Sequence, residues 1–305
     1  MQLPPELKTT LEAVHAEQAA EWIHAFPTLL DDCLRRWSLK LTPPIPWPLT
    51  FGFVAPVRMA DHTPAVLKLT PPGPGATHQL TAMEHFGAAQ GAVRVIHADP
   101  ALCAIVMTRI TPGTSMLQAN LCDDDATEAV AKLITSLQSP LTSAATPHRP
   151  ALPTTADWMK GFDRLRTLHN GTTGPIPERI FEEGHQCFKD LQETTTAAHI
   201  LHGDLHHGNI LKNHRQSWVA IDPQGVIGDP AYEVGAWMRN PTPKAFSLPT
   251  VQRRLDILAE HTELDRERMR RWSMAQAILS ACWSIEDRLG GWQPMLTLAQ
   301  TLKEA

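Results

Sequence analysis

The stretch LHGDLHHGNIL, at residues 201–211, gathers several residue types that can do chemistry. It places Asp204 between His202 and His206, with Asn209 five positions further on. Because alternate residues of an extended segment point to one side, these two histidines and Asp204 could bind a metal ion such as zinc, as in a metal-dependent hydrolase. That arrangement matches no common catalytic zinc spacing and gives Asn209 no role. In the other interpretation the Asp204 carboxylate is the reactive group and the histidines frame it.

The residues that follow this stretch predict a β-hairpin. NILKN and WVAID are short extended runs on either side of the polar turn HRQS. Pairing Leu211 with Ala220 sets Asn209 opposite Asp222. Carboxylate and amide oxygens suit Mg²⁺, which takes few protein ligands and completes its shell with water and phosphate oxygens. The hairpin therefore predicts a magnesium site at Asn209 and Asp222.

The spacing of His202, Asp204 and Asn209 matches H-x-D-x-x-x-x-N, the catalytic-loop pattern of kinases. In that pattern the aspartate accepts the proton of the acceptor hydroxyl, and the asparagine binds a metal ion. Lys68 fits the same chemistry, because it lies in the apolar strand AVLKL, where a buried ammonium group needs an anion such as phosphate to compensate it. The alternative is a lysine at a sheet edge whose side chain reaches water.

Two longer segments, LHGDLHHGNIL and AIDPQGVIGDPAYEVGAWMRNP, resemble the aminoglycoside phosphotransferases, most closely the branch of streptomycin 6-kinases and hydroxyurea phosphotransferases. VAPVRMADHTPAVLKL, GAVRVIHAD and ITPGTSM extend the resemblance over most of the chain. It implies an α+β, protein-kinase-like fold with an N-terminal mixed sheet lobe and a mainly helical C-terminal lobe. It also implies transfer of the γ-phosphoryl group of ATP to a hydroxyl of an aminoglycoside-like acceptor, of the streptomycin or hydroxyurea type.

Carried onto this sequence position by position, the resemblance implies the roles of four residues. Asp204 is the catalytic base. Asn209 and Asp222 are the Mg²⁺ ligands, and Lys68 grips the α and β phosphates of ATP.

The resemblance also implies the rest of the nucleotide site. Thr108, Arg109 and Ile110 form the hinge segment, which holds adenine through backbone groups. The glutamate that pairs with the strand lysine in the family falls at Gln79 here, while Glu84 lies further along the same helix. The partner of Lys68 is then either Glu84 or the neutral amide of Gln79.

The elements that position these residues follow two patterns. Residues 6–38 look helical, with Pro27 opening a second helix, and residues 49–109 contain strands around one helix near 76–90. The expected later helices begin at a capping box of Asp125 and Glu128 and continue near 155–169, 177–194, 230–238, 248–261, 265–289 and 293–303. We therefore expect an N-terminal lobe at 1–109, with a helical lead-in at 1–38, and a C-terminal lobe at 110–305.

The bulk composition narrows the possible partners. The chain has 305 residues, 43% of them hydrophobic, which is enough for one large or two modest domains. Lys and Arg number 27 against 32 Asp and Glu, with no basic block, which argues against nucleic acid as the main partner. Five scattered cysteines without a C-x-x-C pair indicate reduced core thiols. With no signal-peptide pattern and no long apolar run, we expect a cytoplasmic protein that is not in a membrane, of unknown oligomeric state.

Three functions follow from these observations. The first is a small-molecule kinase that uses ATP and Mg²⁺ on a hydroxylated acceptor. The second is a nucleotide-binding scaffold of the same fold with weak or no catalysis, which Gln79 and the loop PWPLTFGF favour, since Gly52 is the one glycine of that loop. The third is the metal-dependent hydrolase built on the histidines. The joint presence of the catalytic-loop, metal-binding and strand-lysine residues favours the kinase.

Overall fold

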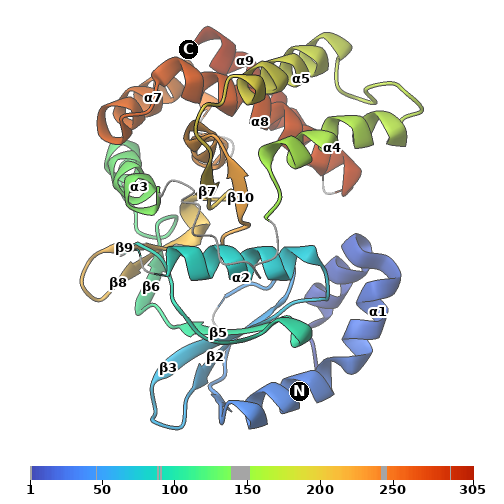
Figure 1. Cartoon of the computed structure of the whole chain (residues 1–305), viewed down its shortest axis with the longest axis vertical. Helices are drawn as coiled ribbons and strands as arrows, with labels where there is room; N and C mark the ends of the chain where they lie inside the picture. The colour runs from blue at the N-terminus through green and yellow to red at the C-terminus, as the bar shows by residue number, and fades with distance from the viewer. Residues whose placement is uncertain are drawn as a thin grey trace.

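The computed structural model describes residues 2–45, 47–87, 89, 91–138, 152–241, 246–288 and 290–305, with the backbone alone for 13–18. A sheet with helices α1 and α2 forms one end of the molecule, and helices α3 to α9 gather toward the other (Figure 1). The helices are α1 (Pro5–Arg36), α2 (Pro74–Phe86), α3 (Asp123–Leu137), α4 (Thr155–Leu168), α5 (Glu178–Glu193), α6 (Val234–Met238), α7 (Leu248–Thr262), α8 (Arg266–Glu286) and α9 (Trp292–Glu304). None of the described helices is long and apolar enough to cross a membrane.

Within the described residues, the strands form three separate sheets. β1 (Lys40–Leu41), β2 (Phe53–Arg58), β3 (Pro64–Leu69), β4 (Val95–Asp99) and β5 (Ala104–Thr108) make the first sheet. β6 (Pro112–Ser115), β8 (Ile210–Asn213) and β9 (Trp218–Ala220) make the second, and β7 (His199–Leu201) with β10 (Val226–Gly228) makes the third. Their order along the chain confirms the strands predicted for residues 49–109 and the helix predicted among them, which is α2. A short 3-10 helix, Pro100–Leu102, also lies between β4 and β5.

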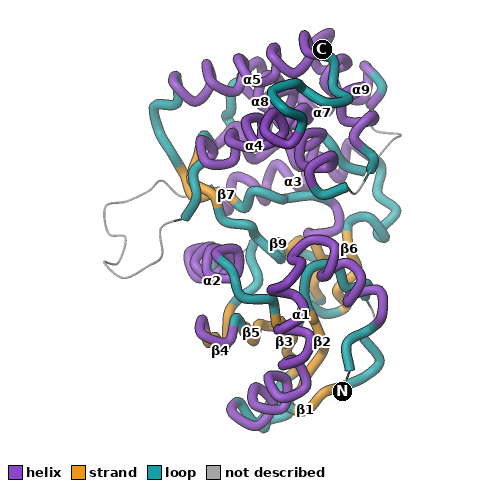
Figure 2. Tube along the Cα trace, turned by 90° about the vertical axis from the view of Figure 1, so that its right-hand side faces the viewer, coloured by secondary structure: helices purple, strands orange, loops and turns teal. Residues whose placement is uncertain are grey.

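The first sheet is antiparallel and has the order β1-β2-β3-β5-β4, so β3 lies at its centre. Helices α1 and α2 lie on different sides of it (Figure 2). Buried residues of α1 pack with Leu67 and Val106, whereas Met83 of α2 packs with Ile105. Because successive side chains of a strand point to opposite faces, Lys68 lies on the α2 face of the central strand.

Helix α1 contradicts the prediction that Pro27 opens a second helix. Residues Pro5–Arg36 form one helix with Pro27 inside it. A proline in a helix interior removes one backbone hydrogen bond and usually kinks or ends the helix. Here Phe26 and Leu30 are fully buried in the core that α1 shares with the sheet. Packing on both sides of Pro27 therefore outweighs the lost hydrogen bond.

The later helices are confirmed to within a few residues at their ends, except that the predicted helix 230–238 consists of a 3-10 helix, Pro230–Glu233, followed by α6. Helix α2 ends at Phe86, earlier than predicted. Residues 88 and 90, at the predicted end of α2, and residue 289, at the predicted end of α8, lie outside the described residues.

The cysteines are free thiols, as predicted, but two of them lie outside the core. Three are buried: Cys33, Cys187 and Cys282. Cys103 is half-buried, and Cys122 is exposed. The Cys122 thiol caps α3 by accepting the backbone N–H of Asp125, so the helix begins at Asp123 and the predicted capping box at Asp125 is wrong.

The β8–β9 hairpin is confirmed, but its predicted register is wrong by one residue. Ile210, rather than Leu211, pairs with Ala220. Ile210 and Ala220 are both buried, and a slip of one residue would turn every side chain of the strand to the opposite face. Asn209 consequently stands opposite Ile221, whose N–H donates to the Asn209 carbonyl oxygen at 2.9 Å.

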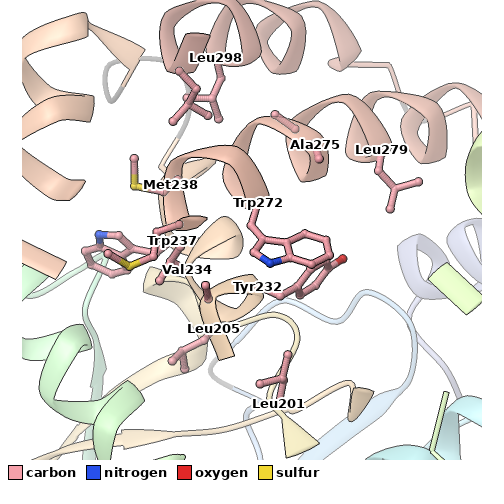
Figure 3. Packing of buried hydrophobic residues seen from close by; sticks show 14 of the residues in the cluster. Leu201, Leu205, Tyr232, Val234, Trp237, Met238, Trp272, Ala275, Leu279 and Leu298 are labelled. Atoms are coloured by element: carbon pink, nitrogen blue, oxygen red, sulfur yellow. The ribbon is translucent and has the colours of Figure 1, made fainter. Parts of the chain in front are cut away.

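The loop between β7 and β8 rests on the largest hydrophobic core of the molecule. Leu201 and Leu205 belong to the same cluster of buried side chains as Tyr232, Trp237 and Trp272 (Figure 3). The loop is therefore anchored by apolar packing on both sides of Asp204.

An aromatic stack ties the loop to the helices below it. The imidazole of His207 is stacked on Trp237, with 3.7 Å between ring centroids and 11° between planes. Arg254 of α7, only 1% exposed, also lies against Trp237. Its guanidinium donates to the Asp123 carboxylate of α3 and, at 2.8 Å, to the carbonyl oxygen of Asn240. One buried cation thus joins α7, α3 and the turn after α6.

We expect Arg254→Ala to lower the free energy of unfolding by about 3 kcal/mol, because it leaves a carboxylate and two carbonyl oxygens without their buried donor. Urea denaturation measures this change. Arg253→Ala is the matched control: Arg253 pairs with Asp124 on the surface, with side-chain exposures of 57% and 45%, and its removal should leave the unfolding free energy nearly unchanged. Equal destabilisation by the two variants would contradict the role assigned to Arg254.

Candidate active site

The loop that carries Asp204 turns at Gly203. Its φ of +80° is in the region that favours glycine, and a Cβ at this position would come within 2.7 Å of the Trp158 ring. Both the backbone conformation and the close approach of Trp158 therefore require glycine. The turn brings Asp204 out of the core between the buried residues Leu201 and Leu205.

The histidines of the loop are held by the protein rather than by a metal. His202, 1% exposed, uses both ring nitrogens: Nε2–H donates to the Ile221 carbonyl at 2.9 Å, and Nδ1 accepts the N–H of Asp204. Burial lowers the pKa of His202, so its ring is neutral. In the described part of the chain, no group of three or more His, Cys, Asp or Glu side chains is placed to hold a metal ion. The histidine-based hydrolase therefore has no structural support.

The other two histidines have different surroundings. His206 is 29% exposed, and its Nδ1 accepts the N–H of Gly208 at 3.0 Å, which leaves the proton on Nε2, 3.5 Å from Asp204 Oδ2. His207 is buried and its ring is stacked on Trp237. Burial lowers the pKa of His207 to about 3.

Several donors surround the Asp204 carboxylate. Arg239 reaches Oδ1 at 3.3 Å, and the Asn209 amide donates to Oδ2 at 3.3 Å and to the Asp204 carbonyl at 2.9 Å. Burial raises the pKa of Asp204, but the His206 contact and the Arg239 charge outweigh it and hold the pKa below its usual value. Asp204 is thus an ionised carboxylate in a fixed orientation.

Asn209 and Asp222 lie at the open end of the hairpin. The side-chain nitrogen of Asn209 donates to Asp204, so the side-chain oxygen of Asn209 is the atom suited to a metal ion. Asp222 has a φ of +61°, a left-handed conformation that is uncommon outside glycine and is often found at functional sites. Its side chain is 43% exposed, so that a cation can reach it from solvent. One amide oxygen and one carboxylate form a donor set that fits Mg²⁺.

Lys68 reaches this end of the hairpin from the first sheet. β2 and β5 flank β3, so Lys68 is not on an edge strand, and its side chain is 13% exposed. Its ammonium group forms an ion pair with Asp222 Oδ1. Burial raises the pKa of Asp222, but Lys68 and the Gln79 amide together hold it below its usual value.

Of the two residues considered as partners of Lys68, Gln79 is the one at the site. Gln79 is 7% exposed and donates to Asp222 Oδ1 at 2.6 Å, the oxygen that also pairs with Lys68. Glu84 lies on the same helix, but its side chain is exposed. The step of five positions from Gln79 to Glu84 turns the helix by about 140°, which places the two side chains on different faces.

The predicted hinge residues follow one another from the end of β5 toward β6. Thr108 pairs with Ala65, and its N–H donates to the Arg94 carbonyl at 2.9 Å, so this N–H is not available to a nucleotide. The Arg109 guanidinium lies 6.0 Å from the centroid of the Trp47 ring. Ile110 packs beside the core under α2.

Glu233 contributes to the site in a way that its position in sequence does not suggest. It is buried, and its carboxylate accepts the backbone N–H groups of His202 at 2.6 Å and Gly203 at 3.0 Å. Burial raises the pKa of Glu233 to about 7, against the lowering effect of these two donors. No local sequence pattern indicated a contact between Glu233 and the loop 31 residues earlier.

Arg239 and Gln276 were also missed. The Arg239 guanidinium donates to Gln276 Oε1 at 3.0 Å as well as to Asp204, and the Gln276 amide donates to the Tyr232 carbonyl. A Cβ at Gly235 would lie 2.3 Å from the Gln276 amide, so this glycine makes room for Gln276. These contacts join α8 to the Asp204 carboxylate through long-range packing, which no sequence spacing indicates.

Comparisons with known proteins agree with this geometry. The family described as "Aminoglycoside/hydroxyurea antibiotic resistance kinase" matches residues 36–288. Streptomycin 6-kinase of Streptomyces griseus is 29% identical over 316 residues, covering 98% of this chain and 96% of the relative. Hydroxyurea phosphotransferase of Kitasatospora aureofaciens is 28% identical over 297 residues, covering 94% and 81%.

Among solved structures, choline kinase LicA from Streptococcus pneumoniae superposes with a TM-score of 0.62 at 12% identity, covering 92% of this chain and 100% of that one. The predicted α+β, protein-kinase-like fold is confirmed by this likeness. The family match spans most of the chain and includes the loop, the hairpin and the strand lysine. The chain belongs to the aminoglycoside/hydroxyurea antibiotic resistance kinase family.

Proposed function

We propose that this protein is an ATP-dependent kinase that phosphorylates a hydroxyl of a small acceptor of the streptomycin or hydroxyurea type. Use of a nucleotide follows from the kinase family. The observation that carries the proposal is the meeting of Lys68 and Asp222 at the open end of the hairpin, beside the loop in which Asn209 contacts Asp204. The names of the relatives supply the acceptor type.

In this proposal, the nucleotide and the metal occupy the space between the first sheet and the hairpin. Asn209 and Asp222 hold Mg²⁺, which when bound neutralises charge on the phosphates. Lys68 binds the α and β phosphates. Residues 108–110 supply backbone groups to adenine, with Arg109 and Ile110 the better placed because the Thr108 N–H is already used. Residues 1–109 form the nucleotide-binding lobe, and 110–305 form the lobe that receives the acceptor.

Asp204 acts on the acceptor. Its carboxylate orients the hydroxyl and takes the proton as the acceptor oxygen bonds to the γ phosphorus and the bond from this phosphorus to the β,γ-bridging oxygen breaks. The products are phosphorylated acceptor and ADP. Arg239 and Asn209 keep the carboxylate in one orientation, so its contribution comes from positioning as well as from proton acceptance. Since the reaction consumes ATP, we place it in the cytoplasm.

The direct test is acceptor-dependent ADP release. Purified protein with Mg²⁺-ATP is incubated with streptomycin, hydroxyurea and a panel of polyols and aminocyclitols, and ADP is measured against a sample without acceptor. We expect at least one of these acceptors to raise ADP release well above the background. Nucleotide binding without release for any acceptor would favour the scaffold alternative instead.

A second expectation concerns stability. Mg²⁺-ATP at a hundredfold excess over its dissociation constant should raise the free energy of unfolding by about 2.7 kcal/mol, because the ligand binds the folded state alone. Thermal or urea unfolding with Mg²⁺-ATP, ATP with EDTA, and Mg²⁺ alone separates the contributions. If saturating Mg²⁺-ATP leaves the melting temperature unchanged and calorimetry detects no binding, the assigned nucleotide site is wrong.

A third expectation separates the base from the metal ligands. Asp204→Asn keeps the volume of the side chain and should lower turnover by at least about a hundredfold, while the affinity for ATP changes little. Asp222→Asn removes a metal ligand's charge and should weaken Mg²⁺-ATP binding as well as turnover. Asp190→Asn, on the exposed surface of α5, serves as the matched control. Undiminished turnover in Asp204→Asn would mean that another residue is the base.

A further inference from the structure

The Gln79 amide makes two hydrogen bonds, and both go to the turn that carries Asp222. Nε2 donates to Asp222 Oδ1 at 2.6 Å and to the Pro223 carbonyl oxygen at 3.1 Å. Both partners can only accept, so the group that faces them must be the NH₂ rather than the oxygen of the amide. Its two hydrogens are thereby used, and Gln79 is 7% exposed.

Helix α2 approaches this turn so closely that the contact is built into the fold. A Cβ at Gly225, where φ is +75°, would lie 2.8 Å from the His78 carbonyl oxygen and 2.9 Å from the Ala82 Cβ. The backbone of the turn therefore packs directly on the helix turn that carries Gln79. The left-handed Asp222 is held between this packing and the Gln79 hydrogen bonds.

A glutamate at position 79 would not fit this arrangement. Its carboxylate would stand where the amide nitrogen stands, against the Asp222 carboxylate and the Pro223 carbonyl, with no hydrogen to offer either of them. Like charges at that distance disfavour each other strongly. The negative partner of Lys68 is instead Asp222 itself.

We infer that Gln79 is a positioning residue for Asp222: its amide holds the metal-binding carboxylate and the following peptide in place, and it does not serve as the ion-pair partner of Lys68. This inference rests on the proposed function, because it assigns Asp222 to the metal. It explains why a neutral amide occupies a position where the family resemblance implied glutamate.

One consequence is a coupling between metal and nucleotide. In the protein without nucleotide, Lys68 and Gln79 share one oxygen of Asp222. With Lys68 bound to phosphate, the Asp222 carboxylate would lack its cation, and Mg²⁺ held by Asn209 and Asp222 would supply the missing positive charge. A nucleotide that binds without a metal ion must separate the ion pair between Lys68 and Asp222. The Asp222 carboxylate then keeps the hydrogen bond from Gln79 but has no cation beside it. Affinity for the nucleotide should thus depend strongly on Mg²⁺, and this dependence should require Gln79.

The test compares nucleotide affinity with and without metal in variants of Gln79. Calorimetry with a non-hydrolysable ATP analogue gives dissociation constants in MgCl₂ and in EDTA. We expect Gln79→Glu to weaken binding in MgCl₂ by about 10–100-fold and to reduce the ratio of the EDTA and MgCl₂ constants, since loss of a residue that orients a metal ligand has effects of this size. Gln79→Met, which keeps the length and removes the donors without adding charge, should act in the same direction but less strongly.

The ratio of the dissociation constants in EDTA and in MgCl₂ distinguishes a loss of Asp222 positioning from a general loss of structure. Partial unfolding would weaken nucleotide binding equally in both solutions and leave this ratio unchanged. The matched control is Gln186→Glu on α5, since Gln186 Nε2 also donates to an aspartate, Asp190, at 2.7 Å, but on an exposed surface. It should leave both constants unchanged.

Two results would overturn the inference in different ways. If the wild type binds the ATP analogue and Gln79→Glu binds it as tightly and with the same metal dependence, a carboxylate at position 79 can pair with Lys68, and our assignment is wrong. If wild type binds no nucleotide in either solution, the proposed function fails, and the role of Gln79 fails with it.

Discussion

The ion pair between Lys68 and Asp222 is the interaction on which the site depends, because it joins the two ends of the molecule across 154 residues of sequence. Lys68 comes from the centre of the first sheet, between α1 and α2, and Asp222 follows the β8–β9 hairpin. A buried charge without its partner costs several kcal/mol, so sheet and hairpin are both constrained by the need to meet here. The hairpin register carries the same constraint: a slip of one residue would bury the wrong face of β8 and move Asp222 away from the lysine.

The loop between β7 and β8 depends on support from the helical end in a similar way. Glu233 accepts two backbone N–H groups of the loop, and Trp237 carries the stacked imidazole of His207. These contacts satisfy buried polar groups that would otherwise destabilise a loop placed on an apolar core. Asp204 is consequently oriented before any substrate binds, and little ordering of this carboxylate is required during the reaction.

Features that depend on residues close together in the chain could be predicted from the sequence, whereas features that depend on contacts between distant segments could not. The spacing of Asp204 and Asn209, the strands around Lys68 and the hairpin are short-range patterns, and the structure brings these residues together. The hairpin register was missed because burial of Ile210 depends on the core beneath it. Pro27 was misread because packing outweighed a local rule. The contacts of Glu233, Arg239 and Gln276 link residues 30 to 44 positions apart and have no periodicity that a sequence could display.

The carboxylates of Asp222 and Asp204 are held by different parts of the molecule. Asp222 is held by Lys68 of the first sheet and Gln79 of α2. Asp204 is held by Arg239, which is itself fixed by Gln276 of α8. A change in the packing of α8 therefore reaches Asp204 through Arg239, and a change in α2 reaches Asp222 through Gln79. The two carboxylates are also connected to each other, because the Asn209 side chain donates to Asp204 and the Asn209 carbonyl accepts the N–H of Ile221, the residue before Asp222. A change on either side that displaces Asn209 is therefore expected to reach both carboxylates.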